Sequence, residues 1–282
     1  MTDQEPRNAE ILLDILIFLE EQLNEMNQEV EEWLYYSESL LHKYYLHAQS
    51  LLNITKGYNL TGSLNKPNFY YTTIFDRSST NTLLRALFEN FLIYQHIYIN
   101  PASNEEKELR LYCLLLKTLI DRSNFNVKSS IAIEIQKNDT NEIERIKELI
   151  KENVSFKELT LKQQEQIILG KTSKFFKRWD QIMEDCRLNE TPIFKQLYYL
   201  LSSHAHSEGL SLLQVKDSNI QLEANDDFIN LSCFIMNILT AKLIMDITKT
   251  FPILEQELHK LSQANINLVK NYQLLFEKCI ES

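Results

Sequence analysis

Two sets of polar residues lie within otherwise apolar stretches of the sequence, and their types could do chemistry. Tyr198, Ser202 and His206 are spaced by four residues, so on a helix they share one face, about one turn apart. A serine hydroxyl beside an imidazole is a candidate nucleophile with its base, although this spacing on one helix more often gives only a hydrogen bond. The alternative is that Tyr198 and His206 are satisfied polar side chains near a helix end. His204 lies off this face.

Arg85 and Glu89 form the second set, also four residues apart and flanked by leucine and phenylalanine. An arginine placed before a glutamate is the less favourable order for stabilising a helix, which favours a role beyond a surface salt bridge. The alternative is an ion pair within one helix that takes no part in catalysis. Because mutual hydrogen bonding is the cheapest way to bury polar groups, we expect the two sets to face each other across a shared pocket.

Metal binding is not indicated by the spacing of the acidic and histidine residues. Glu38 and His42 are four residues apart, and Glu89 and His96 are seven apart. Neither pair reproduces the doubled Glu-x-x-His pattern of di-iron helical bundles. We therefore expect no bound metal and no cofactor.

A short basic stretch is the candidate contact with nucleic acid. It comprises Lys171, Lys174, Lys177 and Arg178, with aromatic residues between them. The formal charge of the chain is −10, so long-range attraction to RNA or DNA is excluded and only a local patch could bind it. The alternative is an amphipathic helix whose lysine stems cover apolar surface.

The elements that must position these residues are helices. The chain has only four glycines and five prolines, and its apolar residues recur at three- and four-residue steps. We expect one all-α domain over residues 1–282, a bundle of seven to nine helices with a long N-terminal helical region at 1–52 and a core at 70–282. The expected helices cover residues 8–52 (one or two), 71–99, 103–122, 128–153, 156–186 (one or two), 191–207, 226–250 and 252–282. The most exposed irregular backbone is expected at 53–69 and 208–226.

The N-terminus and the cysteines predict a cytoplasmic protein. Asp14 and Glu20 interrupt the first apolar run, and no basic region precedes it, so a signal peptide is not expected. The most apolar later stretch, 228–247, keeps polar residues that would be unfavourable in lipid, so we expect no membrane span. The four cysteines are widely spaced and are expected to be reduced thiols.

Three segments carry a resemblance to known proteins: 85–101, 105–125 and 198–208. They resemble a group of bacterial all-helical proteins of unknown function in which an Arg-x-x-x-Glu helix is followed by a Tyr-x-x-x-Ser-x-x-x-His helix. That group is similar to abortive-infection and HEPN-type proteins, whose active members are metal-independent ribonucleases of phage-defence or toxin systems, commonly homodimers. The resemblance implies a HEPN-like core, RNA or a defence-system protein as partner, and a site made of the matching residues, which are Arg85, Glu89, Tyr198, Ser202 and His206.

The sequence departs from the HEPN ribonuclease signature, an arginine four to six residues before a histidine on one helix. The nearest arginine upstream of His206 is Arg187. A ribonuclease mechanism therefore requires Arg85 to approach His206 from another helix. The alternative function is a non-catalytic helical module that recognises a protein or a small-molecule ligand.

Overall fold

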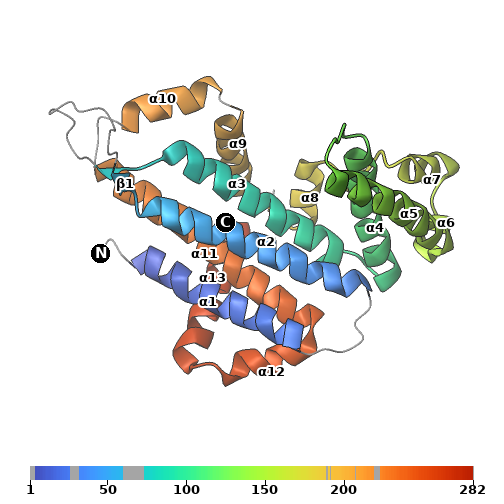
Figure 1. Ribbon diagram of the computed structural model, residues 1–282. Coiled ribbons are helices and arrows are strands. Elements are labelled where there is room, and N and C mark those ends of the chain that lie inside the picture. The colour runs from blue at the N-terminus through green and yellow to red at the C-terminus, as the bar shows by residue number, and fades with distance from the viewer. Residues whose placement is uncertain are drawn as a thin grey trace. The chain divides into compact units, whose positions relative to one another are not determined.

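The computed structural model describes residues 4–25, 32–59, 73–188, 190, 192–206, 208–218 and 223–281, and it is almost entirely helical (Figure 1). In these residues the only strands are β1 (Tyr58–Asn59) and β2 (Thr73–Ile74), which form one two-residue antiparallel ladder. The all-α prediction is confirmed. The α-helices are α1 (Gln4–Glu25), α2 (Glu32–Thr55), α3 (Arg77–Tyr94), α4 (Asn104–Ser123), α5 (Ser130–Glu152), α6 (Val154–Lys157), α7 (Leu161–Ile168), α8 (Trp179–Asp185), α9 (Pro192–Ala205), α10 (Gly209–Ser218), α11 (Glu223–Thr250), α12 (Pro252–Lys260) and α13 (Gln263–Glu281), and a π-helical turn, η1 (Gln95–Ile99), follows α3.

The described residues contain thirteen α-helices, so the expected count of seven to nine was wrong. Part of the excess comes from the segment after α5, where polar caps divide the chain, and the rest from α10 and from the division of 252–282 into α12 and α13. Asn153 accepts the backbone N–H of Phe156 and starts α6, while Thr160 and Gln163 form a capping box that starts α7. Gly170, with φ +62°, ends α7 in the left-handed conformation.

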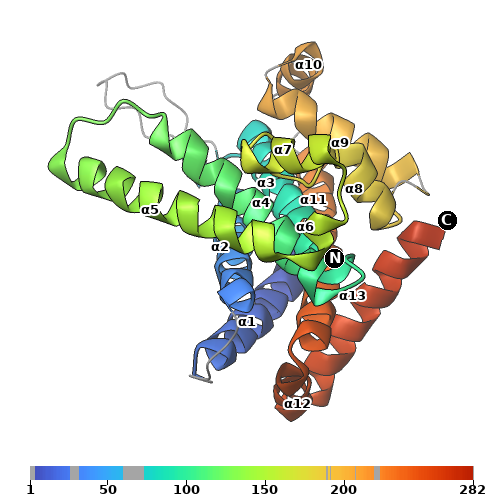
Figure 2. The ribbon, with the colours of Figure 1, turned by 90° about the vertical axis from the view of Figure 1, so that its right-hand side faces the viewer.

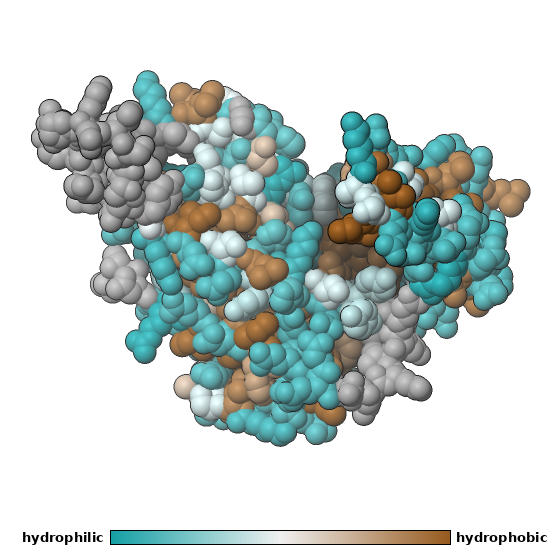
Figure 3. Space-filling model, viewed as in Figure 1, coloured by the Kyte–Doolittle hydropathy of each residue, from teal (hydrophilic) through white to brown (hydrophobic). Residues whose placement is uncertain are grey.

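The predicted irregular segment 208–226 is largely helical, because Gly209–Ser218 forms α10 and α11 already begins at Glu223. Among the α10 side chains whose burial the structure describes, only Ser211 is buried, and Leu212 and Leu213 are 66% and 60% exposed. Brown surface over this helix is visible in Figure 3. Without a buried apolar stripe, the helical period is hard to read from sequence. Most of the other predicted loop, 53–69, lies outside the described residues.

Two compact units divide the chain. Unit 1 comprises Met1–Leu92 and Arg187–Ser282, and unit 2 comprises Ile93–Cys186. Compact units of this kind can belong to one domain or to two, so the expected single domain stays a prediction.

Helix α11 is the centre of unit 1. It packs against α1, α2, α12 and α13, and Leu239, Ile244 and Ile247 along it are fully buried (Figure 1). From Ser232 to Thr248 no residue of α11 is exposed, so this part of the helix is covered on all sides by its neighbours, as a largely apolar helix requires.

Polar side chains on α11 are paired with the helices that cover it. The Asn237 amide donates to Glu5 Oε2 at 2.8 Å, and Tyr272 donates to the same oxygen at 2.7 Å. Thr240 and Tyr44 share a buried hydroxyl hydrogen bond of 2.9 Å. Because a buried polar group without a partner is costly, these bonds fix which residues of α1, α2 and α13 lie opposite α11.

One helix in the described residues, Asp226–Thr250 within α11, is long and apolar enough to cross a membrane by length and composition. Of its apolar window, 61% is buried inside the structure. Core helices of water-soluble proteins share these properties, so the expected absence of a membrane span stays a prediction.

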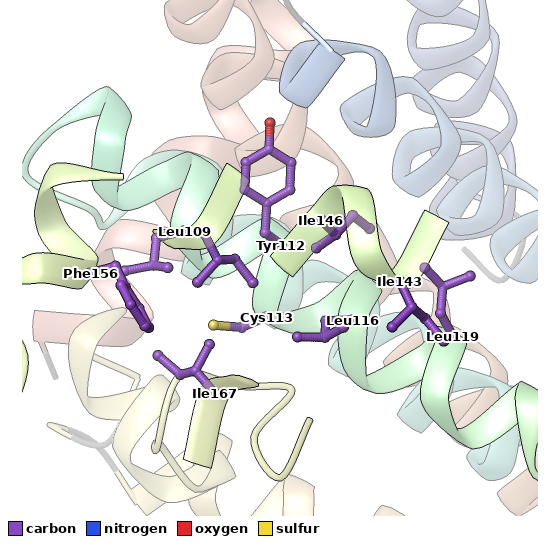
Figure 4. Close-up of a cluster of buried hydrophobic side chains, with 10 residues drawn as sticks. Leu109, Tyr112, Cys113, Leu116, Leu119, Ile143, Ile146, Phe156 and Ile167 are labelled. Carbon is purple, nitrogen blue, oxygen red and sulfur yellow. The ribbon is translucent and has the colours of Figure 1, made fainter. Parts of the chain in front are cut away.

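Unit 2 is built on the helix pair α4 and α5, which run side by side (Figure 2). Figure 4 shows the core between them, where Leu109, Leu116 and Ile146 pack with Phe156 and Ile167. Outside this core, α5 exposes a charged face with ion pairs between residues three apart, as expected for a surface helix.

Gly170→Ala should destabilise unit 2. The left-handed backbone of Gly170 costs an L-residue about 1–2 kcal/mol, and a Cβ there would overlap with Ile120 Cδ1, which would have to move. We expect a lower denaturation midpoint in urea, followed by circular dichroism. The matched control is Gly209→Ala, because no atom lies within 4 Å of a Cβ at that position. Equal midpoints for the two variants would contradict the assigned conformation.

Candidate polar site of helices α3 and α9

Aromatic packing holds α3 against α9. Phe88 and Phe194 are almost completely buried, and their rings stack with centroids 6.0 Å apart. The Tyr198 ring lies 6.3 Å from Phe88. Because Phe88 lies between Arg85 and Glu89 in sequence, and Phe194 is one turn before Tyr198, this contact directs the two polar sets toward each other (Figure 1).

Four of the five predicted site residues form one connected network. Arg85 Nε donates to Glu89 Oε1 at 3.0 Å, and the Tyr198 hydroxyl donates to the same oxygen at 3.0 Å. Arg85 Nη1 lies 3.2 Å from His206 Nε2, and the guanidinium carbon is 5.6 Å from the centre of the Tyr198 ring. The expected meeting of the two sets is observed, whereas the shared pocket stays a prediction.

Ser202 contributes to this network through its backbone. Its carbonyl accepts the His206 N–H at 3.1 Å, and its side chain is half-buried on the same helix. Within the described residues, the Ser202 hydroxyl makes no hydrogen bond to the other four side chains, so the serine and histidine are not arranged as a nucleophile with its base.

The hydrogen-bond donors define the protonation states in the network. An arginine can only donate, so His206 Nε2 accepts and a neutral His206 carries its proton on Nδ1. Burial, together with the nearby charge of Glu89, raises the pKa of Tyr198 to about 12, so the phenol is protonated at neutral pH. Burial opposes ionisation of Arg85, but the hydrogen bond and charge of Glu89 outweigh it and raise the arginine's pKa.

The network is balanced in charge and open at one end. The Arg85 and Glu89 side chains are 17% and 26% exposed, whereas His206 is exposed to solvent. His206 is therefore the member that a ligand meets first, with the Arg85 guanidinium directly behind it. Among the described residues, no group of three or more histidine, cysteine or acidic side chains could hold a metal ion.

His204 lies apart from this network, as the sequence predicts. It is buried, and its Nδ1 is 3.4 Å from the Ser78 hydroxyl at the start of α3. The end of α9 therefore has two histidines with different surroundings: a buried His204 beside Ser78 and an exposed His206 beside Arg85.

The basic stretch of residues 171–178 lies in unit 2, between α7 and α8, so its assignment to a helix was wrong. Thr172 accepts the N–H of Phe176 at 2.8 Å and holds this segment in a turn. Lys177 is paired with Asp185 at 2.5 Å and Arg178 with Asp180 at 2.9 Å. Half of the basic side chains proposed to bind nucleic acid are thus already neutralised by carboxylates.

A second buried polar cluster, in unit 2, was missed as a site by the sequence reasoning. Arg110 donates to His96 and to Glu106, and both His96 and Arg110 are at least 95% buried. In the sequence, His96 was considered only with Glu89, as a possible pair of metal ligands, and that pair was rejected. The sequence feature that could have indicated this cluster is the spacing of Glu106 and Arg110. They are four residues apart, with the acidic residue first, which is the favourable order for an ion pair within a helix.

Tyr198→Phe should lower stability by about 1 kcal/mol, because it removes the hydroxyl that donates to Glu89 and leaves that carboxylate with one donor fewer. Chemical denaturation measures this loss. Tyr199→Phe is the matched control, since its ring is 66% exposed and we expect no measurable change there. If both variants unfold alike, the Tyr198–Glu89 hydrogen bond contributes nothing.

Comparisons with known proteins provide no independent information about the function of this site. No family model, curated protein or solved structure matches the chain. The function of the Arg85 network is therefore argued from its residues and their contacts.

Proposed function

We propose that the protein is a metal-independent ribonuclease of the phage-defence or toxin type, acting in the cytoplasm, with the Arg85 network as its centre. The observation that carries this proposal is the 3.2 Å contact between Arg85 Nη1 and His206 Nε2 at the exposed end of the network. A guanidinium beside an imidazole combines a phosphate-binding cation with a general base. The resemblance stated above supports the same residues.

The chemistry begins when an RNA phosphate takes the place of His206 as acceptor for Arg85 Nη1. The lone pair of His206 Nε2 is then free to accept the proton of the 2′-hydroxyl. The 2′-oxygen attacks phosphorus, the bond to the 5′-oxygen breaks, and water protonates that oxygen. The products are a 2′,3′-cyclic phosphate and a 5′-hydroxyl, and Arg85 stabilises the negative charge that grows on the phosphate oxygens.

Glu89 and Tyr198 are positioning residues in this proposal. Glu89 Oε1 accepts from Arg85 Nε and from the Tyr198 hydroxyl, so it fixes the guanidinium while Nη1 faces His206. We assign Ser202 no chemical step, since only its backbone carbonyl contacts His206. A HEPN-like core and a homodimer belong to the proposal through the resemblance.

In unit 2, Lys171 and Lys174 remain candidates for contacts with RNA, because the described residues provide no carboxylate partner for either. We do not extend this role to Lys177 and Arg178, because both are ion-paired. The net charge of −10 further restricts RNA contacts to a local surface.

The charge balance within the network favours a second candidate function. Glu89 neutralises Arg85, and the Tyr198 phenol carries no charge, so these three side chains together have no excess positive charge to attract a phosphate. A binding module that recognises a protein or a small molecule through the exposed His206 would need no such excess.

His206→Ala should abolish RNA cleavage, with a loss of about 100-fold or more, because the general base is removed. The assay incubates purified protein with total RNA in the presence of a chelator. His259→Ala is the control, because His259 is an exposed histidine of unit 1 outside the network. We expect this variant to cleave like the parent.

Arg85→Lys separates the two candidate functions. A lysine keeps the charge but loses the fork that contacts Glu89 and His206 together, so cleavage should fall while the fold is kept. Cleavage that persists in both the His206 and Arg85 variants would remove this centre from the mechanism. Absence of cleavage in the parent protein, with ligand or partner binding weakened by His206→Ala, would establish the binding module instead.

A further inference from the structure

Three local departures from regular structure converge on His96 in unit 2. The first is the π-helical turn η1 that carries it, closed by the bond from the Asn100 N–H to the Gln95 carbonyl at 2.9 Å. Such turns are rare and are frequently found at functional sites. The His96 side chain is only 1% exposed.

The second departure is a buried contact between an arginine and this histidine. Arg110 Nη1 donates to His96 Nδ1 at 3.0 Å and to the His96 carbonyl at 2.7 Å. Since Nδ1 accepts, the neutral ring must carry its proton on Nε2. Burial and the positive charges of Arg110, Lys177 and Lys174 lower the pKa of His96 to about 3, so the ring is neutral at physiological pH.

The Nε2–H group of His96 is consequently a buried donor, and within the described residues it has no hydrogen-bond partner. The backbone of Lys174 is close enough to act on the histidine and opposes the lowering of its pKa, but it does not provide a hydrogen bond of normal geometry. An unsatisfied buried donor in a folded protein calls for an acceptor.

The third departure is in the segment that includes Lys174. Phe175 and Phe176 both have left-handed backbone conformations, with φ of 45° and 66°. Non-glycine residues in this region are strained and gather at ligand-binding sites and switch segments. The Phe175 ring lies 5.6 Å from the guanidinium carbon of Arg110, so the strained pair packs directly against the arginine that holds His96.

The charges around His96 leave one cation without a counter-charge. Arg110 is paired with Glu106 at 2.5 Å, and Lys177 with Asp185 at 2.5 Å. Lys174 makes no ion pair within the described residues, and its ammonium lies 4.5 Å from the centre of the Trp179 ring. The cluster therefore lacks one negative charge and one hydrogen-bond acceptor.

We propose that unit 2 binds a phosphate-type oxyanion between the Nε2–H group of His96 and the ammonium of Lys174, with a shift of residues 172–177 admitting it. A single oxyanion provides both the missing acceptor and the missing charge. A buried water would satisfy only the donor, whereas an oxyanion would also interact with the half-buried ammonium of Lys174. This site shares no residue with the Arg85 network and does not rest on the proposed ribonuclease activity.

The test is nuclear magnetic resonance of the full-length protein with ¹⁵N-labelled histidine, titrated with inorganic phosphate at constant ionic strength. We expect a saturable shift of the His96 ring nitrogens, assigned by the loss of that signal in His96→Gln. The parallel titration with chloride should give no saturable shift. Phosphate bound at the Arg85 network would instead move the signal of His206.

Lys174→Gln should weaken phosphate binding by about tenfold, since one charge-assisted hydrogen bond is lost. Lys162→Gln is the matched control, because Lys162 is an exposed lysine of α7 in the same unit, and phosphate binding by this variant should be unchanged. No saturable movement of the His96 signal, or equal weakening by the two lysine substitutions, would overturn the proposal.

Discussion

Burial of the middle of α11, from Ser232 to Thr248, is the constraint around which unit 1 is arranged. The first and last helices of the chain, α1 and α13, both pack on it. Apolar contact alone would allow these helices to slide or turn, but the polar residues of α11 each require a partner. Asn237 meets Glu5, and Thr240 meets Tyr44, so each covering helix has one alignment in which the buried groups are paired.

The need to pair buried polar groups also determines the Arg85 network, but this network is only half-buried and one end of it is exposed. Stacking of Phe88 on Phe194 brings α3 and α9 together and carries Arg85 and Glu89 into a half-buried position. Tyr198 and His206 complete the hydrogen bonds there. The network is saturated at its inner end and ends in an exposed imidazole, which is an arrangement suited to exchange one partner without unfolding.

Helical periodicity was sufficient to predict the all-α fold and the segments that carry Arg85 and Tyr198. It also indicated their meeting, because two polar sets in apolar helices have few other partners. It could not predict α6, α7 and α8 as separate helices, since single caps such as Asn153 and Thr160 decide those boundaries. Nor could it find the cluster around His96, which depends on a π-helical turn and on left-handed phenylalanines that leave no periodic signal.

The division into units decides which unit can be complete first during synthesis on the ribosome. Unit 2 is one uninterrupted segment, Ile93–Cys186, whereas unit 1 is assembled from the two flanking segments. All of unit 2 has been synthesised before the first residue of α11 exists, so α1 cannot pack on α11 until more than 190 residues have followed it. During that interval α1 and α2 can pack on each other, but the apolar faces that α11 covers in the folded protein stay exposed.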